Sequence, residues 1–147
     1  MVDISIIIIN YNSEDYTVNC IKSLFEHTST TLKCQYIIVD NGSTKKSYLH
    51  VKNYIDSIAK EHPITLVRSN INTGFGGGNM LGVQHAKGQY LAFVNNDTVL
   101  ESDCLVVLKK VMDMRPDVGV CGPQAFTDDK KILPTIDHFA SPVREIF

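Results

Sequence analysis

Residues 4–13 read ISIIIINYNS, a nearly continuous apolar run that passes directly into polar residues. A short run of this kind, rich in β-branched side chains, is typical of a strand that is buried on both faces of a sheet. Three further runs share this character, at residues 36–39, 64–67 and 90–94, and residues 118–121 form a weaker fifth candidate. Strands buried on both faces occur mainly in parallel sheets, so we predict one here.

Apolar residues at helical spacing separate these runs. The spacing predicts helices after Ser13 and over residues 48–58, 79–86 and 105–112. Asn12 and Ser13 offer a cap for the first helix, and Ser102 or Asp103 offers one for the last. Strands that alternate with helices form right-handed βαβ units. The predicted fold class is therefore α/β, with three α/β/α layers around a mostly parallel sheet.

The composition excludes several classes of protein. The chain has 147 residues, 44% of them hydrophobic, and a formal net charge of −2, which suits one globular domain and gives no basic face for nucleic acid. No apolar run approaches the ~20 residues of a transmembrane segment, and Met1 is not followed by the positive charges that begin a signal peptide. The cysteines form no C-x-x-C pair, so we expect thiols and a soluble, cytoplasmic protein.

Polar residues follow three of the predicted strands, as Asn10-Tyr11-Asn12, Asp40-Asn41-Gly42-Ser43 and Asn95-Asn96-Asp97. In open α/β sheets, ligands bind beyond the carboxyl ends of the strands, where the strand order reverses. If the first and fourth strands are neighbours, Asp40 and Asp97 should face one crevice. The alternative is that these residues are ordinary turn formers.

The glycine-rich segment at residues 72–79, NTGFGGGN, does not fit the dinucleotide-binding pattern G-x-G-x-x-G, because Asn79 stands where its last glycine would be. The glycines would let the backbone approach a ligand closely, or they form a flexible turn at the start of a helix.

These motifs together resemble glycosyltransferase family 2, and most of all its rhamnosyltransferase-like branch. Residues 5–13, 37–43, 72–82 and 93–97 carry the resemblance, in the order and with the spacing of the family. It extends over roughly residues 3 to 125. The family has the GT-A fold, whose Rossmann-like half binds a nucleoside-diphosphate sugar.

The resemblance implies a transferase, typically inverting, that moves a sugar from a UDP- or dTDP-sugar to a saccharide or lipid-linked acceptor. It implies that Asp40 binds the pyrimidine base and that Asp97, the last acid of the D-x-D motif, holds Mg²⁺ or Mn²⁺ on the diphosphate. Arg68 is a candidate phosphate contact or a solvated surface arginine. The expected nucleotide-binding set is Asn10, Tyr11, Asn12, Asp40, Arg68, Asn72, Gly74, Asn79, Asn95 and Asn96.

The chain departs from the family pattern in three ways. Residues 95–97 hold one carboxylate instead of two, and Gly78 replaces a residue that is often basic. Family domains also continue beyond the position of Phe147, with the acceptor surface and the catalytic base. We expect residues 1–125 to be the donor-binding core and residues 126–147 to begin the acceptor side.

These departures lead us to expect a truncated domain, engineered or natural, that does not transfer sugar alone and can self-associate through an uncovered apolar face. Two alternatives remain at this point, a sugar-phosphate nucleotidyltransferase and a non-catalytic α/β binding module. The first would place a glycine- and basic-rich loop after the first strand, and a receiver-like module would need paired acids early in the chain.

Overall fold

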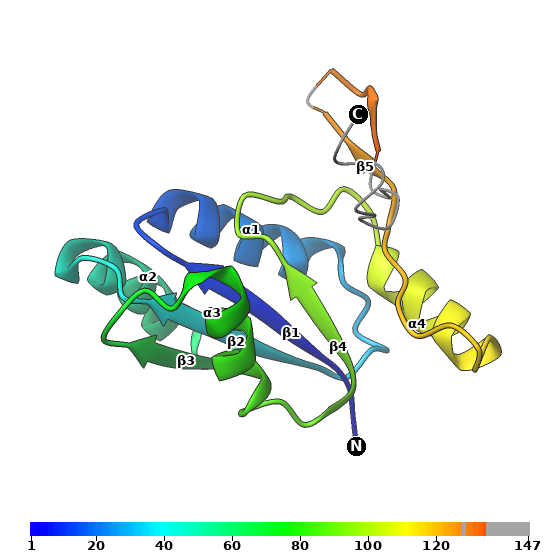
Figure 1. The fold of residues 1–147 in the computed structure, drawn as a ribbon, viewed down its shortest axis with the longest axis horizontal. Helices are drawn as coiled ribbons and strands as arrows, with labels where there is room; N and C mark the ends of the chain where they lie inside the picture. Colours follow the sequence, from blue (N-terminus) through cyan, green and yellow to red (C-terminus); the bar gives the residue numbers. More distant parts are fainter. Residues whose placement is uncertain (128, 135–147) are drawn as a thin grey trace, which may run out of the picture. The chain divides into compact units, whose positions relative to one another are not determined.

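Four parallel strands form the central sheet of the structure, a computed structural model that describes residues 1–127 and 129–134. The strands are β1 (Val2–Asn10), β2 (Cys34–Asn41), β3 (Ile64–Ser69) and β4 (Gly88–Val94). Their order is β3-β2-β1-β4, so β1 lies between β2 and β4. The strand order therefore reverses between β1 and β4, and the first and fourth strands are neighbours, which meets the condition set in the sequence analysis (Figure 1).

Helices cover both faces of this sheet, which confirms the α/β/α layers. They are α1 (Glu14–His27), α2 (Lys45–Ile58) and α3 (Gly74–Val83). Figure 1 shows α1 and α2 together on one face and α3 on the other. Side chains alternate between the faces of a strand, so Ile6 and Ile8 pack against α1 and α2, whereas Ile7 packs on the α3 side. The isoleucine run is continuous because β1 is covered on both sides.

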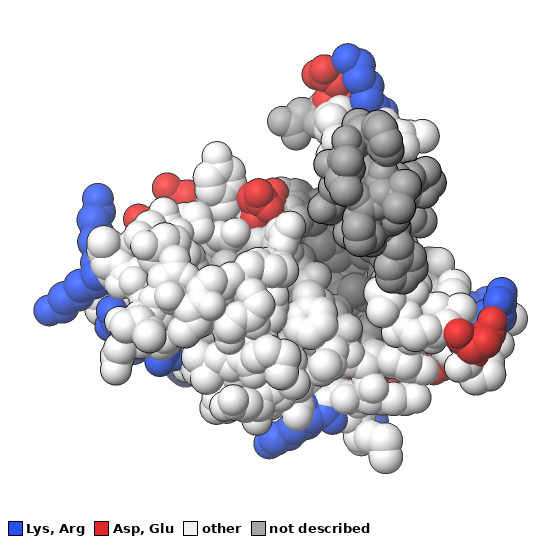
Figure 2. Space-filling view, in the orientation of Figure 1, with Lys and Arg blue, Asp and Glu red and all other residues white. Residues whose placement is uncertain are grey.

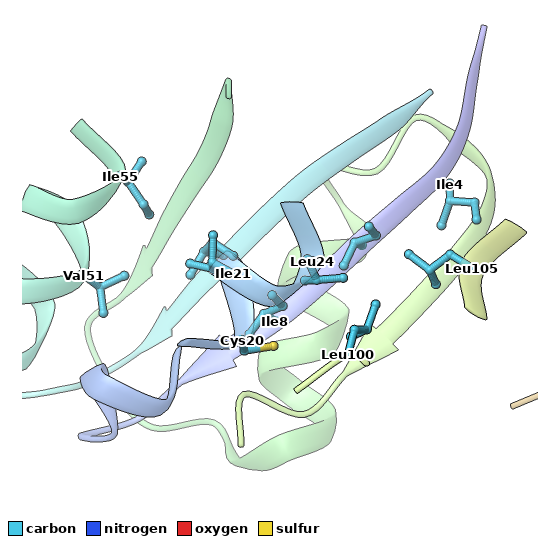
Figure 3. Packing of buried hydrophobic residues seen from close by; sticks show 11 residues of the cluster. Ile4, Ile8, Cys20, Ile21, Leu24, Val51, Ile55, Leu100 and Leu105 are labelled. Atoms are coloured by element: carbon cyan, nitrogen blue, oxygen red, sulfur yellow. The ribbon is translucent and has the colours of Figure 1, made fainter. Parts of the chain in front are cut away.

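The larger hydrophobic cluster lies between the sheet and the pair α1 and α2. Figure 3 shows Ile8 of β1 among Cys20, Ile21 and Leu24 of α1, with Val51 of α2 beside them. All these side chains are buried. This cluster fixes α1 and α2 on the sheet, and with them the loops that follow β1 and β2.

Helix α3 differs from its predicted bounds, because it begins at Gly74 and not at Asn79 and ends at Val83 before Ala86. Its glycines favour a turn by intrinsic propensity, but they let the helix lie very close to the sheet. A Cβ on Gly82 would be 2.6 Å from Cγ2 of Ile7, and one on Gly78 would be 3.0 Å from Cδ1 of Ile9. Close packing on β1 thus offsets the poor helix propensity.

Contacts divide the chain into two units, Met1–Val106 and Val107–Phe147, and helix α4 (Cys104–Met114) spans the division. Asp103 is the cap of α4, since its Oδ1 accepts a hydrogen bond from the backbone N–H of Val106 at 3.3 Å. The prediction of a domain boundary after residue 125 stays a prediction.

In the second unit, β5 (Ala125–Phe126) and β6 (Ile132–Leu133) form a short antiparallel pair. The sequence Asp128-Asp129-Lys130-Lys131 predicts a turn between them; Asp129 lies in a turn, and Asp128 is outside the described residues. The prediction of a strand at residues 118–121 was wrong: this segment is not paired, and Val120 is 90% exposed. An apolar segment becomes a strand only beside a partner, and this one has none among the described residues. In the part of the chain that the structure describes, no helix is both long and apolar enough to cross a membrane.

Candidate functional site

An open cleft of about 300 Å³ lies at the carboxyl ends of β1 and β4, in the first unit. It is lined by Ile9, Tyr11 and Ser13 around the end of β1, by Asn41, by Asn72, Gly74 and Phe75 before and within α3, and by residues 94–97. This is the position at which the strand order reverses, where a ligand is expected in an open α/β sheet. The volume is at the small end of the range for small-molecule sites.

Six of the predicted site residues meet in this cleft: Tyr11, Asn72, Gly74, Asn95, Asn96 and Asp97. Asn10, Asn12, Asp40, Arg68 and Asn79 do not line it. Asn79 is buried within α3 at 8% exposure. All three strand ends therefore reach the cleft, the second of them through Asn41, whereas Asp40 lies elsewhere.

The loop after β4 presents Asn95 and Asp97 to solvent. It forms a turn in which the N–H of Thr98 donates to the carbonyl oxygen of Asn95 at 3.1 Å. Within the described residues, no hydrogen bond or ion pair is found for the carboxylate of Asp97. The two side chains are thus available to a ligand in the cleft.

Asn96 has a different role from its neighbours. Its Nδ2 donates to Oγ of Ser13 at 2.6 Å and to Oγ1 of Thr17 at 2.9 Å, which fastens the loop to the start of α1. The Ser13 side chain makes no cap hydrogen bond to α1, contrary to the sequence-based expectation.

A single carboxylate at the cleft sets the kind of metal site that is feasible. Among residues 1–127 and 129–134, no group of three or more His, Cys, Asp and Glu side chains could hold a metal ion. Mg²⁺ commonly binds through one or two protein carboxylates and the phosphates of a substrate, and keeps several waters. Asp97 fits a cation that is shared with a diphosphate, and does not fit a site made by protein ligands alone.

Aromatic side chains lie on the cleft as well. Tyr11 follows β1 and is 48% exposed, and Phe75 in the first turn of α3 is 62% exposed. Phe75 was missed by the sequence analysis, although an aromatic residue within a glycine-rich segment is a usable signal. Figure 2 shows that the face around α3 carries few charged side chains. The cleft can therefore offer ring surfaces to a base but few cations to a phosphate.

Asp40 is fully buried and points to the opposite side of β2 from Asn41. Its Oδ1 accepts a hydrogen bond from Nδ2 of Asn10 at 3.0 Å, and its Oδ2 lies 3.4 Å from Nε of Arg68. Successive residues of a strand face opposite sides, so Asp40 faces α1 and α2 while Asn41 faces α3. The structure thus places neither Asp40 nor Arg68 at the cleft.

Asn41 was not predicted as a site residue, and it fixes the loop before α3. Its Nδ2 donates to Oδ1 of Asn72 and to the carbonyl oxygen of Gly74, both at 3.0 Å. Its Oδ1 accepts from the N–H of Thr73 at 3.1 Å and from the Thr73 hydroxyl at 2.9 Å. Gly74 has φ +73°, a conformation that favours glycine. Asn41 belongs to the motif at residues 40–43, from which the sequence analysis chose Asp40 as the site residue. The motif therefore contained the signal for this role.

Asn12 links the ends of β1 and β2 behind the cleft. It has φ 51°, its N–H donates to Oγ of Ser43 at 3.1 Å, and its Oδ1 accepts from the N–H of Thr44 at 2.9 Å. Asparagine is among the residues that tolerate this left-handed conformation. Asn12 therefore shapes the turn that carries Tyr11.

A thiol also lies close to the site. Sγ of Cys20 is 3.6 Å from the carbonyl oxygen of Asn95. Burial, and secondly the negative charge of Asp97, raises the pKa of Cys20 to about 12. Because the thiolate is the nucleophilic form, Cys20 is inert at neutral pH.

Comparisons with known proteins agree with this geometry. A family model described as glycosyl transferase family 2 matches residues 5–143. Glycosyltransferase GlyA of Streptococcus pneumoniae is 27% identical over 128 residues, which cover 86% of this chain and 18% of GlyA. The S. aureus TarS structure in complex with UDP-GlcNAc has a TM-score of 0.66 and 20% identity, over 78% of this chain and 32% of that one.

A mannosyltransferase from Pyrobaculum calidifontis, PcManGT in complex with GDP-Man and Mn²⁺, has a TM-score of 0.65 and 17% identity, over 74% of this chain and 32% of its own. The chain thus spans about a fifth of GlyA and about a third of each solved structure. The structural likenesses show the GT-A fold. The family model covers most of the sequence, and it includes the sheet, the cleft and all four motifs. This chain belongs to glycosyltransferase family 2.

Proposed function

We propose that the cleft binds the nucleoside diphosphate of a sugar donor, with UDP or dTDP as the nucleotide, and that the whole enzyme transfers the sugar with inversion to a saccharide or lipid-linked acceptor. The observation that carries this proposal is the cleft itself, which combines aromatic surface with one accessible carboxylate, Asp97, at the reversal of strand order. PcManGT and TarS were solved with GDP-Man and UDP-GlcNAc, which supports a nucleotide sugar as the ligand.

The residues of the cleft have separate roles in this proposal. Tyr11 and Phe75 would hold the base between them by stacking, since both rings are exposed on the cleft. Asn95 would offer its amide to the ribose or the phosphates. Asn96 holds the loop in place through its hydrogen bonds to α1.

Asp97, with the diphosphate oxygens, would hold Mg²⁺ or Mn²⁺. The bound cation would neutralise the charge that develops on the diphosphate leaving group. Few cationic side chains lie on the face around α3, which is consistent with this need (Figure 2). The catalytic base is proposed to come from a region that follows the residues described here, and the 147-residue chain is proposed to bind donor without transferring sugar.

A thermal-shift panel tests this proposal. The chain is melted with UDP, dTDP, GDP and NAD, each with and without Mn²⁺, and with Mn²⁺ alone. A ligand present at 100 times its Kd stabilises the folded state by about 2.7 kcal/mol. We expect the melting temperature to rise with UDP or dTDP, and to rise more when Mn²⁺ is present. Stabilisation by NAD alone, or by none of the diphosphates with metal, would contradict the proposal.

A further inference from the structure

We infer that the buried hydroxyl of Thr17 in α1 is a positioning group that couples the proposed cation site to the proposed base site, because it joins the turn that carries Asp97 to the strand end that carries Tyr11. The inference rests on the proposed function, since it concerns how the two parts of the donor site are held relative to each other. It gives a role to a helix residue outside the four motifs that carry the family resemblance.

Asp97 occupies a central position of a tight turn. The N–H of Thr98 donates to the carbonyl oxygen of Asn95 at 3.1 Å, which closes the turn around Asn96 and Asp97. The Asp97 carboxylate makes no hydrogen bond or ion pair within the described residues. Its position is therefore set by the backbone of this turn, and a contact that holds the turn also holds the carboxylate.

Helix α1 holds the segment after β4 on both sides of this carboxylate. Before it, Nδ2 of Asn96 donates to Oγ1 of Thr17 at 2.9 Å and to Oγ of Ser13 at 2.6 Å. After it, the N–H of Leu100 donates to Oγ of Ser23 at 3.0 Å. The contact with Thr17 is the buried one of the two that hold the Asn96 amide, because Thr17 has no exposed surface and Ser13 is half-buried.

The same hydroxyl reaches the end of β1. It donates to Oδ1 of Asn10 at 2.9 Å. The carbonyl oxygen of Ser13 also lies within 3.1 Å, but it already accepts from the backbone N–H of Thr17. Nδ2 of Asn10 donates to the carboxylate of Asp40 at 3.0 Å, which turns the amide oxygen of Asn10 toward Thr17. A hydroxyl has one proton and two lone pairs, so Thr17 can serve Asn10 and Asn96 at once.

Burial separates this role from contact with the ligand. Thr17 has no exposed surface, so the donor cannot reach its side chain. Asn10 is fully buried as well, and the next residue, Tyr11, lines the cleft. The hydroxyl thus holds the proposed base contact and the proposed metal ligand relative to each other before any ligand binds. Groups that are already ordered need no free energy of ordering at the binding step.

The test compares Thr17→Val with Thr17→Ser. Valine keeps the shape of threonine and lacks the hydroxyl, whereas serine keeps the hydroxyl. Ser5→Ala is the matched control, because Ser5 is equally buried and its Oγ accepts from the N–H groups of Lys87 and Gly88 at 3.1 and 2.8 Å. Ser5 lies toward the other end of β1 from the cleft, so this control loses buried hydrogen bonds without a change at the turn.

The first readout is hydrogen exchange of the Thr98 amide in the ligand-free chain, which measures opening of the turn. Thr17→Val should lower its protection about fivefold, the equivalent of one hydrogen bond. Thr17→Ser and Ser5→Ala should leave it nearly unchanged. Unchanged protection in Thr17→Val would overturn the inference. So would the absence, in the wild-type chain, of a nuclear Overhauser effect between the side chains of Asn96 and Thr17, a measurement that requires no variant to fold.

The second readout is the Kd of UDP without Mn²⁺ divided by its Kd with Mn²⁺, both measured by calorimetry. This ratio measures the coupling between cation and nucleotide. Thr17→Val should lower the ratio about fivefold, because the carboxylate that shifts takes part only in the metal-bound complex. Thr17→Ser and Ser5→Ala should keep the wild-type ratio. An unchanged ratio in Thr17→Val, or an equal fall in Ser5→Ala, would overturn the inference.

The remaining outcomes are also decisive. If Thr17→Ser behaves like Thr17→Val, the effect comes from packing of the methyl group, and the inference fails. If the wild-type chain binds UDP neither with nor without Mn²⁺, the proposed function fails, while hydrogen exchange and the Overhauser effect still decide whether Thr17 holds the turn.

Discussion

Replacing Gly82 by alanine tests the close approach of α3 to the sheet, on which the position of the cleft loop depends. The new Cβ would lie 2.6 Å from Cγ2 of Ile7 and 3.2 Å from Cγ2 of Val39. Both neighbours are fully buried, β-branched side chains of central strands, so neither can turn aside. The helix or the strands must therefore shift.

Two opposing terms set the magnitude. Alanine is better than glycine in a helix by about 1 kcal/mol, and overpacking a core costs roughly 1–3 kcal/mol. A contact of 2.6 Å places Gly82→Ala at the upper part of that range. We expect a net loss of about 1–2 kcal/mol of unfolding free energy. Each kcal/mol lowers the melting temperature of a chain of about 150 residues by roughly 2–4 °C.

Gly76→Ala is the matched control, in the same helix. A Cβ at Gly76 meets nothing within 4 Å, so the propensity term stands alone and stability should rise by up to about 1 kcal/mol. Urea denaturation followed by circular dichroism measures both variants. If Gly82→Ala is as stable as Gly76→Ala, α3 does not lie this close to β1, and the packing argument is refuted.

Three further changes test the site and its supports. Asp97→Ala should abolish the Mn²⁺-dependent part of stabilisation by UDP in a thermal-shift assay and leave the ligand-free melting temperature nearly unchanged; a large drop in the latter would make Asp97 a structural residue. Thr44→Ala removes the acceptor of the Ser47 N–H at 3.3 Å at the start of α2 and should cost about 1 kcal/mol in urea unfolding, and no loss would disprove the cap. Burial raises the pKa of Cys20 from about 9 to about 12, so between pH 9 and pH 12 the unfolded chain binds fewer protons than the folded chain. The contribution of Cys20 to the unfolding free energy should therefore be complete below about pH 9 and be lost as the pH rises toward 12. An unfolding free energy that does not change over this pH range would contradict this.

The elements that the sequence predicts well are those whose pattern depends on local neighbours. The run at Ile6–Ile9 indicates a strand covered on both faces, and the stripe that includes Val51 and Ile55 indicates one buried side of a helix. The start of α3 could not be predicted in this way. Its glycines oppose a helix locally, and what favours the helix is contact with Ile7 and Ile9, which are distant in sequence.

In the site too, some features follow from the local sequence and others depend on contacts between residues that are distant in sequence. The end-of-strand rule located the cleft and Asp97, because it needs only the order of the elements. It could not decide between Asp40 and Asn41, since a difference of one residue in a strand reverses the face to which a side chain points. That choice is made by the pairing of β2 with β1 and β3, which brings Asp40 beside Arg68.

Asn41 uses both ends of one amide, with the nitrogen and the oxygen each making two hydrogen bonds to residues 72–74. An aspartate there could keep the contacts with Thr73 but would repel the oxygens of Asn72 and Gly74. Exchanging this nitrogen for oxygen would release the loop before α3. The free energy needed to order the loop would then lower the affinity for ligand, because the loop would become ordered on binding and not on folding. In an evolving lineage, the residue at position 41 thus sets whether the loop is preorganised or becomes ordered only around its ligand.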